Sequence, residues 1–294
     1  TLGNKYPMDE YRLIRDYQNG EIIFDRRYGS TNTFEKNNYP VGYNLGQSGN
    51  TPSQNLVDAY EMIDGTPFDW NNPEHKSNPY ANRDPRLAMS ILTNNVEFKD
   101  RTIEAWTGGR DGKGVIHATR TGYYIYKFID PNLDLLQNRT SVHHWVIMRY
   151  AEILLSYAEA MNEAYGPTGN VGYRLNAVRA LNQVRNRVGV EMPAVPTAIS
   201  KEELREKIRN ERRVELAFED HRFWDVRRWM IAEQEGVMSG AMYGIKIYWI
   251  NSSPQEFRYT PYLYENRTFT KKMYLHPFST NEVNKGYLIQ NPGY

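Results

Sequence analysis

Tyrosine and tryptophan are the residues best suited to recognise a ligand in this sequence. Aromatic residues make up 13% of the chain, and 23 of them are Tyr. Each ring combines an apolar face with a polar tip, which suits surfaces that bind amphiphilic ligands as well as core edges. Trp70 stands out, because FDWNNP (68–73) places it in a turn-rich loop beside Asp69, Asn71 and Asn72, which can hydrogen-bond hydroxyl groups. The alternative is that Trp70 only packs the loop onto the body.

Motifs for catalysis or metal binding are weak. TGGRDGKG (107–114) is similar to a phosphate-binding loop, but its glycine spacing is wrong and Gly114 stands where Ser or Thr would bind Mg²⁺. His143 and His144 are adjacent, so their side chains point apart and cannot chelate one ion together. The chain has no cysteine, which excludes thiolate metal sites, disulfides and a cysteine nucleophile. We therefore expect no metal and no cofactor.

Acidic residues do not designate a catalytic pair. A glycoside hydrolase needs two carboxylates about 5–10 Å apart, one of them with a raised pKa. Asp58, Glu61 and Asp64 are candidates, but their spacing predicts the solvated face of an amphipathic segment. We therefore expect a protein that is not an enzyme.

Charge and hydropathy argue against two kinds of partner. Lys plus Arg number 36 and Asp plus Glu number 35, and this balance gives no reason to expect nucleic acid or an anionic membrane. No apolar run approaches the roughly 20 residues that a membrane-spanning helix needs. Residues 1–20 show neither the basic nor the apolar region of a signal peptide.

The chain divides into three parts. Residues 1–144 are rich in turn-forming Gly, Asn, Pro and Asp, with short helical or strand-like stretches at 56–63, 86–94 and 121–129. Residues 145–235 have helical periodicity, and residues 236–294 mix loops with a strand-like segment at 245–250. The pattern predicts a mainly α protein with long irregular loops and a few short strands.

The helical part is clearly amphipathic. In 149–167, apolar residues fall on one face and a Gly-Pro stop ends the helix. A second helix at 173–189 should pack against the first as an antiparallel pair. Ser200 and Glu203 have the spacing of a capping box, which predicts a third helix that continues to residue 219.

The segment ERRVELAFEDHRFWDVRRWM (211–230) mixes large aromatic residues with many charged ones. A solvated face would not need so many aromatics, and a simple core would not accept so many charges. We therefore predict a paired network in which arginine forks meet carboxylates between helices. His221 and Asp225 should be paired core groups of this network, and we assign three tryptophans to packing: Trp145, Trp224 and Trp229.

This segment closely resembles the signature of the SusD/RagB family, in which E-R-x-x-E-[LF] leads into H-R-[FW]-x-D-[LV]-[RK]-R-W. Further blocks match the family in the same order: TPSQNLVDAYEMIDG (51–65), NRDPRLAMSIL (82–92), TGYYIYKF (121–128), RYAEILLSYAEAMNEA (149–164), LNQVRNRVGV (181–190) and KKMYLHPFSTNEVNKGYLIQNPGY (271–294). Seven collinear blocks cover nearly all of the chain.

The resemblance implies a SusD-like fold with a tetratricopeptide-like helical hairpin at 149–189. It also implies that a helical N-terminal half, which in the family begins at a lipidated cysteine, is absent from this sequence. Membrane association would come only through that absent anchor. Because one hairpin cannot bury both of its faces, we expect a large apolar surface on 149–189.

The resemblance further implies a function in nutrient uptake on the outward-facing side of the outer membrane of Bacteroidetes. Such proteins bind an oligosaccharide or polysaccharide and deliver it to a SusC-like TonB-dependent transporter. Rings stack on sugar faces while polar groups bond hydroxyls. The family's pattern gives these candidates here: Tyr43 and Trp70, with Asn71 and Asn72, and less strongly Phe68, Tyr80 and Trp106. A RagB-type peptide-capturing subunit and a helical scaffold without a small ligand remain alternatives, and a glycoside hydrolase is a weaker one.

Overall fold

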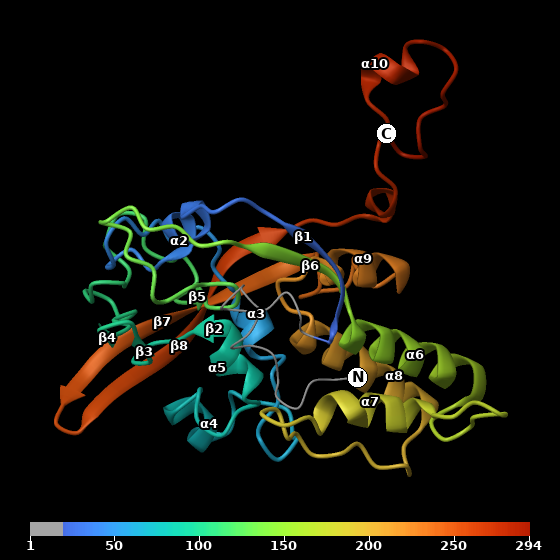
Figure 1. Cartoon of the computed structure of the whole chain (residues 1–294), viewed down its shortest axis with the longest axis horizontal. Coiled ribbons are helices and arrows are strands. Elements are labelled where there is room, and N and C mark those ends of the chain that lie inside the picture. The colour runs from blue at the N-terminus through green and yellow to red at the C-terminus, as the bar shows by residue number, and fades with distance from the viewer. Residues whose placement is uncertain (1–19) are drawn as a thin grey trace.

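The computed structural model describes residues 20–294 (Figure 1). Residues 1–19, where the sequence shows no signal-peptide pattern, lie outside the described residues. Up to residue 143 the described chain is mostly loop, as predicted. Its short elements are β1 (Ile22–Arg27), α2 (Thr33–Asn38), α3 (Gln54–Val57), α4 (Pro73–Ser77), α5 (Arg86–Ser90), β2 (Ile91–Leu92), β3 (Glu97–Phe98), β4 (Arg101–Thr102) and β5 (Tyr124–Ile125).

Antiparallel strand pairs tie these loops together. β1 pairs with β6 (His144–Arg149), β2 with β5, and β3 with β4. β6 runs directly into the first long helix, so the β1–β6 ribbon joins the loop-rich part to the helices (Figure 1). The strand predicted over 121–129 shrinks to β5, because positive φ angles at Gly122 and Phe128 turn the chain on either side of it.

Three helices form one packed group: α6 (Tyr150–Tyr165), α7 (Ala177–Arg185) and α8 (Lys201–Glu215). Their shared core includes Leu154, Leu155, Val178, Leu181, Leu204 and Ile208. The predicted capping box of Ser200 and Glu203 opens α8 and is confirmed. The predicted large apolar surface on the first two helices is reduced, because α8 buries much of it. Ile153 and Tyr165 are the large apolar side chains of α6 that stay exposed.

Two strands of 13 residues each form a long hairpin, β7 (Gly240–Ser252) and β8 (Gln255–Arg267). The sequence indicated only 245–250 as strand, so most of this element was missed. Near its middle, Ile245, Ile247 and Tyr259 are buried in the core of the loop-rich part. Its tip extends past the loops at the end of the molecule opposite α6–α8 (Figure 1).

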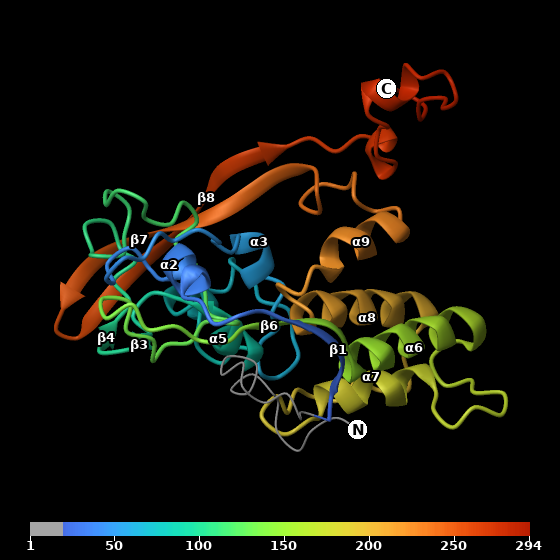
Figure 2. The same ribbon diagram turned by 45° about the horizontal axis from the view of Figure 1, so that its top comes forward.

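The C-terminal segment, with η1 (Lys271–Tyr274) and α10 (Thr280–Val283), rises away from the body (Figures 1 and 2). Its base is held by α9 (His221–Arg228), where Arg227 donates to the Met273 carbonyl and Phe223 stacks on His276 at a ring separation of 6.1 Å. Within residues 20–294, no helix is both long enough and apolar enough to span a bilayer.

Candidate functional site

Buried ion pairs join the loop-rich part to the helices. The fully buried Arg86, from α5, donates to Glu211 at 2.6 Å and to Glu215 at 2.9 Å. The fully buried Arg149, at the end of β6, reaches Glu215 at 2.7 Å and Glu219 at 2.7 Å. Further pairs of this network, which we call the lattice, are Arg86–Asp84, Arg149–Glu21, Arg187–Glu21, Arg187–Glu215, Arg185–Glu211, Arg185–Glu61 and Lys127–Glu219. The network predicted around 211–230 is confirmed.

Glu215 is the carboxylate at the centre of the lattice. Burial alone would favour its neutral form, but Arg187, Arg149 and Arg86 outweigh burial and hold the pKa of Glu215 well below its usual range. All three of its arginine partners lie outside 211–230, and sequence reasoning did not name them. The available signal was their position in the family-like blocks 82–92, 149–164 and 181–190.

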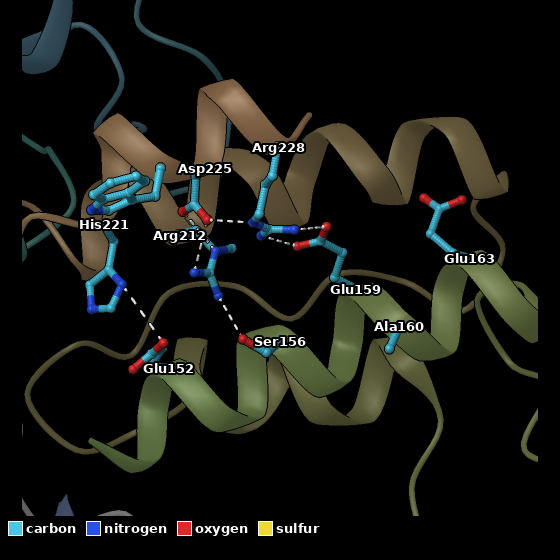
Figure 3. Close-up of a pocket in the computed structure, with 10 residues that line it drawn as sticks. Glu152, Ser156, Glu159, Ala160, Glu163, Arg212, His221, Asp225 and Arg228 are labelled. Carbon is cyan, nitrogen blue, oxygen red and sulfur yellow. Dashed lines mark hydrogen bonds and ion pairs between the residues drawn. The ribbon is translucent and has the colours of Figure 1, made fainter. Parts of the chain in front are cut away.

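A cleft of about 390 Å³ separates α6 from α9 (Figure 3). Arg212 pairs with Asp225 at 2.9 Å and Arg228 pairs with Glu159 at 2.5 Å, so these charges are satisfied within the cleft. Asp225 is buried and paired with Arg212 and Arg228, as predicted for a core group of the network. His221 was predicted to be a paired core group as well, but it is only half-buried and faces Glu152 across the cleft at 3.7 Å.

The tryptophans assigned to packing behave differently from one another. Trp145 packs against a small core cluster with Phe128. Trp229 is half-buried and donates its indole N–H to Glu159 at 2.8 Å. Trp224 is 61% exposed, so its assignment to packing is wrong. α9 buries Asp225 and Val226, which leaves Trp224 turned to the outside.

A groove of about 920 Å³ lies between the loop that follows α3, the loop over 193–199 and α8. Its apolar lining includes Pro67, Pro193, Val195, Pro196 and Ile199, and its polar lining includes Asp58, Glu61, Asp64, Arg185, Glu206, Lys207 and Asn210. An apolar floor with convergent polar groups is the usual form of a site for a small ligand. Sequence reasoning did not identify the 193–199 wall.

Asp58 and Glu61, two acidic residues of this groove, do not form the solvated helix face that the sequence predicted. α3 ends at Val57, so no helix presents them to water. Burial raises the pKa of Asp58, although Gln54 and Trp70 donate hydrogen bonds to it. Glu61 is buried and pairs with Arg185 at 2.9 Å and with Lys207 at 2.8 Å.

Trp70 lies beside the groove and is coupled to it through Asp58. Its indole Nε1–H is 3.1 Å and 3.3 Å from the two carboxylate oxygens of Asp58. The edge of its ring meets Phe68 at a centroid separation of 5.1 Å, and Phe68 in turn lies over the guanidinium of Arg83 and against His75. These contacts hold the half-buried indole in one orientation.

The two amides after Trp70 have distinct local roles. Asn71 is exposed, and its Nδ2 donates to Asp69 at 3.0 Å. Asn72 caps α4, because its Oδ1 accepts from the backbone N–H of Glu74 at 2.9 Å. Within residues 20–294, the Asn71 Oδ1 and the Asn72 Nδ2 make no hydrogen bond, so both remain available to a ligand.

Tyr80 and Trp106 belong to a row of aromatic rings along the hairpin. Tyr80 meets Tyr259 at 5.3 Å, and Trp106 meets Phe257 at 5.3 Å and Trp249 at 4.7 Å. Trp249 is 42% exposed, whereas Tyr80 and Trp106 are half-buried against the core of the loop-rich part, as Trp70 is. Tyr80 and Trp106 contact rings of the hairpin, whereas Trp70 contacts Asp58 at the groove. The aromatic residues on either side of the turn in 248–259, namely Tyr248, Trp249, Phe257 and Tyr259, were the signal that could have found the row.

Tyr43 offers little surface for stacking. It is only 8% exposed, its hydroxyl donates to the Phe98 carbonyl at 2.7 Å, and the guanidinium of Arg101 covers its ring at 3.9 Å. A second cavity, of about 590 Å³, borders Tyr43 but is lined mostly by other residues. Contacts from β3 and β4 thus leave little of this ring for a sugar to stack on.

The adjacent histidines point to separate carboxylates. His144 Nδ1 is 2.8 Å from Asp25, and His143 Nε2 is 3.0 Å from Glu35. In the described part of the chain, no group of three or more His, Cys, Asp or Glu side chains could hold a metal ion.

Comparison with known proteins is consistent with this geometry. The SusD family profile matches residues 20–294. SusD-like protein P2 of Formosa agariphila is 35% identical over 111 residues, which are 36% of this chain and 20% of that protein. The crystal structure of a SusD-like protein from Bacteroides fragilis has a TM-score of 0.79 and 30% identity, and covers all of this chain and 58% of its own. A SusD-like carbohydrate binding protein from the same species has a TM-score of 0.76 and 27% identity, over 96% of this chain and 57% of its own.

The chain thus spans somewhat more than half the length of these solved relatives. The profile match extends over almost all of the sequence and includes every lattice residue named above. The chain belongs to the SusD family.

Proposed function

We propose that this chain captures an oligosaccharide or polysaccharide in the groove beside Trp70 and does not modify it. The observation that carries the proposal is the indole of Trp70, held by Asp58, a residue that lines the groove of about 920 Å³. The neighbouring amides of Asn71 and Asn72 have hydrogen-bonding capacity to spare. The B. fragilis relative described as a carbohydrate binding protein supports the same class of ligand.

The geometry suits recognition of a sugar ring. A pyranose has an apolar face that stacks on an aromatic ring and hydroxyls at its edge that bond to amides and carboxylates. Trp70 is oriented before ligand arrives, because Asp58 holds its N–H and Phe68 braces its edge. Such preorganisation reduces the ordering cost of binding.

The acidic groups of the groove are explained without catalysis. Glu61 is paired with two cations, and Asp58 accepts hydrogen bonds from Gln54 and Trp70. Each contact holds a loop or a ring in place. These structural roles support our proposal that the groove holds its ligand for delivery and does not modify it.

Family membership supports further parts of the proposal. The protein would act at the cell surface, on the outward-facing side of the outer membrane, anchored by lipid. It would pass its ligand to a SusC-like TonB-dependent transporter. The antiparallel packing of α6 and α7 would represent one tetratricopeptide-like hairpin.

A binding panel tests the proposal. Wild type, Trp70→Ala and the matched control Trp224→Ala, which removes an exposed indole on α9, are titrated with plant, host and bacterial polysaccharides by affinity electrophoresis and calorimetry. We expect at least one glycan to bind and Trp70→Ala to weaken it about tenfold or more, equivalent to about 1.4 kcal/mol. If Trp224→Ala alone lost binding, the site would lie in the α6–α9 cleft and the proposal would fail.

Peptide capture is a second candidate that one observation favours. In the described residues β7 and β8 form a two-stranded sheet with no third strand. The outer edge of β7 is partly occupied, because the Ile245 N–H donates to the Thr121 carbonyl and the Ile247 carbonyl accepts from the Thr107 N–H, so β8 is the strand that leaves its outer edge open. An extended peptide can add to such an edge through main-chain hydrogen bonds. The same panel should include unstructured peptides, and peptide binding that survives Trp70→Ala while no glycan binds would favour this candidate.

A further inference from the structure

The groove beside Trp70 has an acidic lining. Within residues 20–294, six carboxylate side chains line this groove, but only two basic side chains do. The carboxylates belong to Asp58, Glu61, Asp64, Glu202, Glu203 and Glu206, and the basic groups belong to Arg185 and Lys207. The chain as a whole has a net charge of only +1, so the excess of negative charge is a feature of the groove and not of the chain.

Both basic groups of the lining are already paired with carboxylates. Arg185 lies 2.9 Å from Glu61 and 2.7 Å from Glu211, and the Lys207 ammonium lies 2.8 Å from Glu61. An entering sulfate or carboxylate group would have to take a cation away from Glu61, which is buried. Leaving a buried carboxylate without its partner is costly. Among its described lining residues, the groove therefore offers an anionic ligand no free cation.

Three carboxylates of the lining are exposed and have no cation of their own. They belong to Asp64, Glu202 and Glu203, and in the part of the chain that the structure describes the ion pairs of the groove involve none of them. Hydrogen bonds from Thr66 and Ser200 hold the pKa of Asp64 and Glu203, respectively, below their usual ranges. Both groups are therefore charged at neutral pH.

The charge of a ligand should therefore decide whether it is retained. A carboxylate or sulfate on the ligand would be repelled by the exposed carboxylates, whereas hydroxyl and ammonium groups would find hydrogen-bond acceptors there. Salt screens exposed charges over about 8 Å at physiological ionic strength. The repulsion should therefore act on a ligand inside the groove and should weaken as salt is added.

We propose that the groove accepts uncharged or amine-bearing saccharides and rejects saccharides that carry uronic acid or sulfate groups. This inference rests on the proposed capture function and adds to it the class of glycan. The apolar floor would contact the sugar rings, and the carboxylates would select by charge. Repulsion of the wrong ligand is a common source of specificity.

The charge selectivity of the groove can be measured without a glycan. Because the chain has no cysteine, Ala198→Cys places a single thiol at an exposed position of the groove lining. Ser252→Cys, at the exposed end of β7, is the matched control. Each variant is reacted with two methanethiosulfonate reagents, one carrying a trimethylammonium group and the other a sulfonate. The ratio of the two rates removes differences in the intrinsic reactivity of the thiol.

We expect the ratio of cationic to anionic rate to be about fivefold higher in Ala198→Cys than in Ser252→Cys. Adding Glu202→Gln should lower the ratio in Ala198→Cys. Adding Glu97→Gln, which removes an exposed carboxylate on β3 outside the groove, should leave the ratio unchanged. The proposal is overturned if the two cysteine variants have the same ratio, or if Glu202→Gln has no effect on it.

Matched glycans then test the same selectivity on the ligand itself. A neutral glycan that binds in the panel is compared by calorimetry with the same glycan after oxidation of its primary alcohols to carboxylates. We expect the oxidised form to bind wild type about fivefold more weakly, and Glu202→Gln or added salt to recover part of the loss. A loss that neither of these changes would be steric and would overturn the proposal.

Acidic glycans give the opposite test. If polygalacturonate or chondroitin sulfate bound, lost binding in Trp70→Ala, and bound more tightly than its methyl-esterified or desulfated form, the proposal would be overturned. If no glycan bound, the capture function would fail, and the thiol reactions would still decide whether the groove selects by charge.

Discussion

Replacing Glu215 with Gln should destabilise the whole protein. The substitution keeps the size of the side chain but removes a fully buried negative charge that faces Arg86, Arg149 and Arg187. Breaking a buried ion pair by removing one partner costs about 3–5 kcal/mol, since the remaining charge stays buried. Each of the three arginines keeps another carboxylate, so we expect the lower end, about 3 kcal/mol.

The assay is equilibrium unfolding in urea at pH 7, with melting temperature as a second measure. For a protein of this size about 3 kcal/mol corresponds to a fall of roughly 6–12 °C in Tm. Glu163→Gln is the matched control, because Glu163 pairs with Arg205 and Lys201 but is 42% exposed. It should cost less than about 1 kcal/mol. If Glu215→Gln were no more destabilising than this control, the lattice would not stabilise the fold and our reasoning would be refuted.

Three further predictions follow from single features of the structure. Burial would raise the pKa of Glu215 and Glu219, but their arginine and lysine partners outweigh burial and lower it. The stability that these two carboxylates contribute is therefore present above the unfolded pKa of about 4.3, and it is lost as the pH falls toward their folded pKa values. Urea unfolding from pH 7 to pH 3 should show this loss, and a flat profile would contradict it. Tyr43→Phe should cost about 1 kcal/mol by removing the bond to the Phe98 carbonyl, and should leave ligand affinity unchanged in calorimetry. Gly112→Ala should destabilise by about 1–3 kcal/mol in urea, because its Cβ would lie 1.7 Å from the Trp106 carbonyl oxygen; stability equal to wild type would show that this loop yields.

The sequence predicted those features that depend on local pattern or on charge balance. The periodicity over 149–167 predicted α6, and Ser200 with Glu203 predicted the start of α8. The lattice could be predicted because 211–230 holds too many charges for a core and too many aromatics for a surface. Its distant partners, such as Arg86 and Arg149, could not, since long-range pairs leave no local spacing.

Exposure of single side chains was predicted less well, because it depends on which elements fold over a residue. Tyr43 lies in a turn-rich stretch, which favours an exposed ring, yet β3 and β4 cover it. Trp224 lies in the segment of charged and aromatic residues that we assigned to packing, yet it projects from α9. Asp58 has the spacing of a solvated helix face, but the helix stops at Val57. The long hairpin was missed because Gly240, Gly244 and Pro261 interrupt its strand pattern.

The most direct test of the sugar-capture account is to observe Trp70 while ligand binds. The protein has six tryptophans, so 5-fluorotryptophan labelling gives six fluorine resonances, which single Trp→Phe variants assign. At saturation with a glycan that binds in the panel, the account predicts a shift of the Trp70 resonance and constant Trp145, Trp224 and Trp229 resonances. An unchanged Trp70 resonance alongside a shift at any of those three would contradict it.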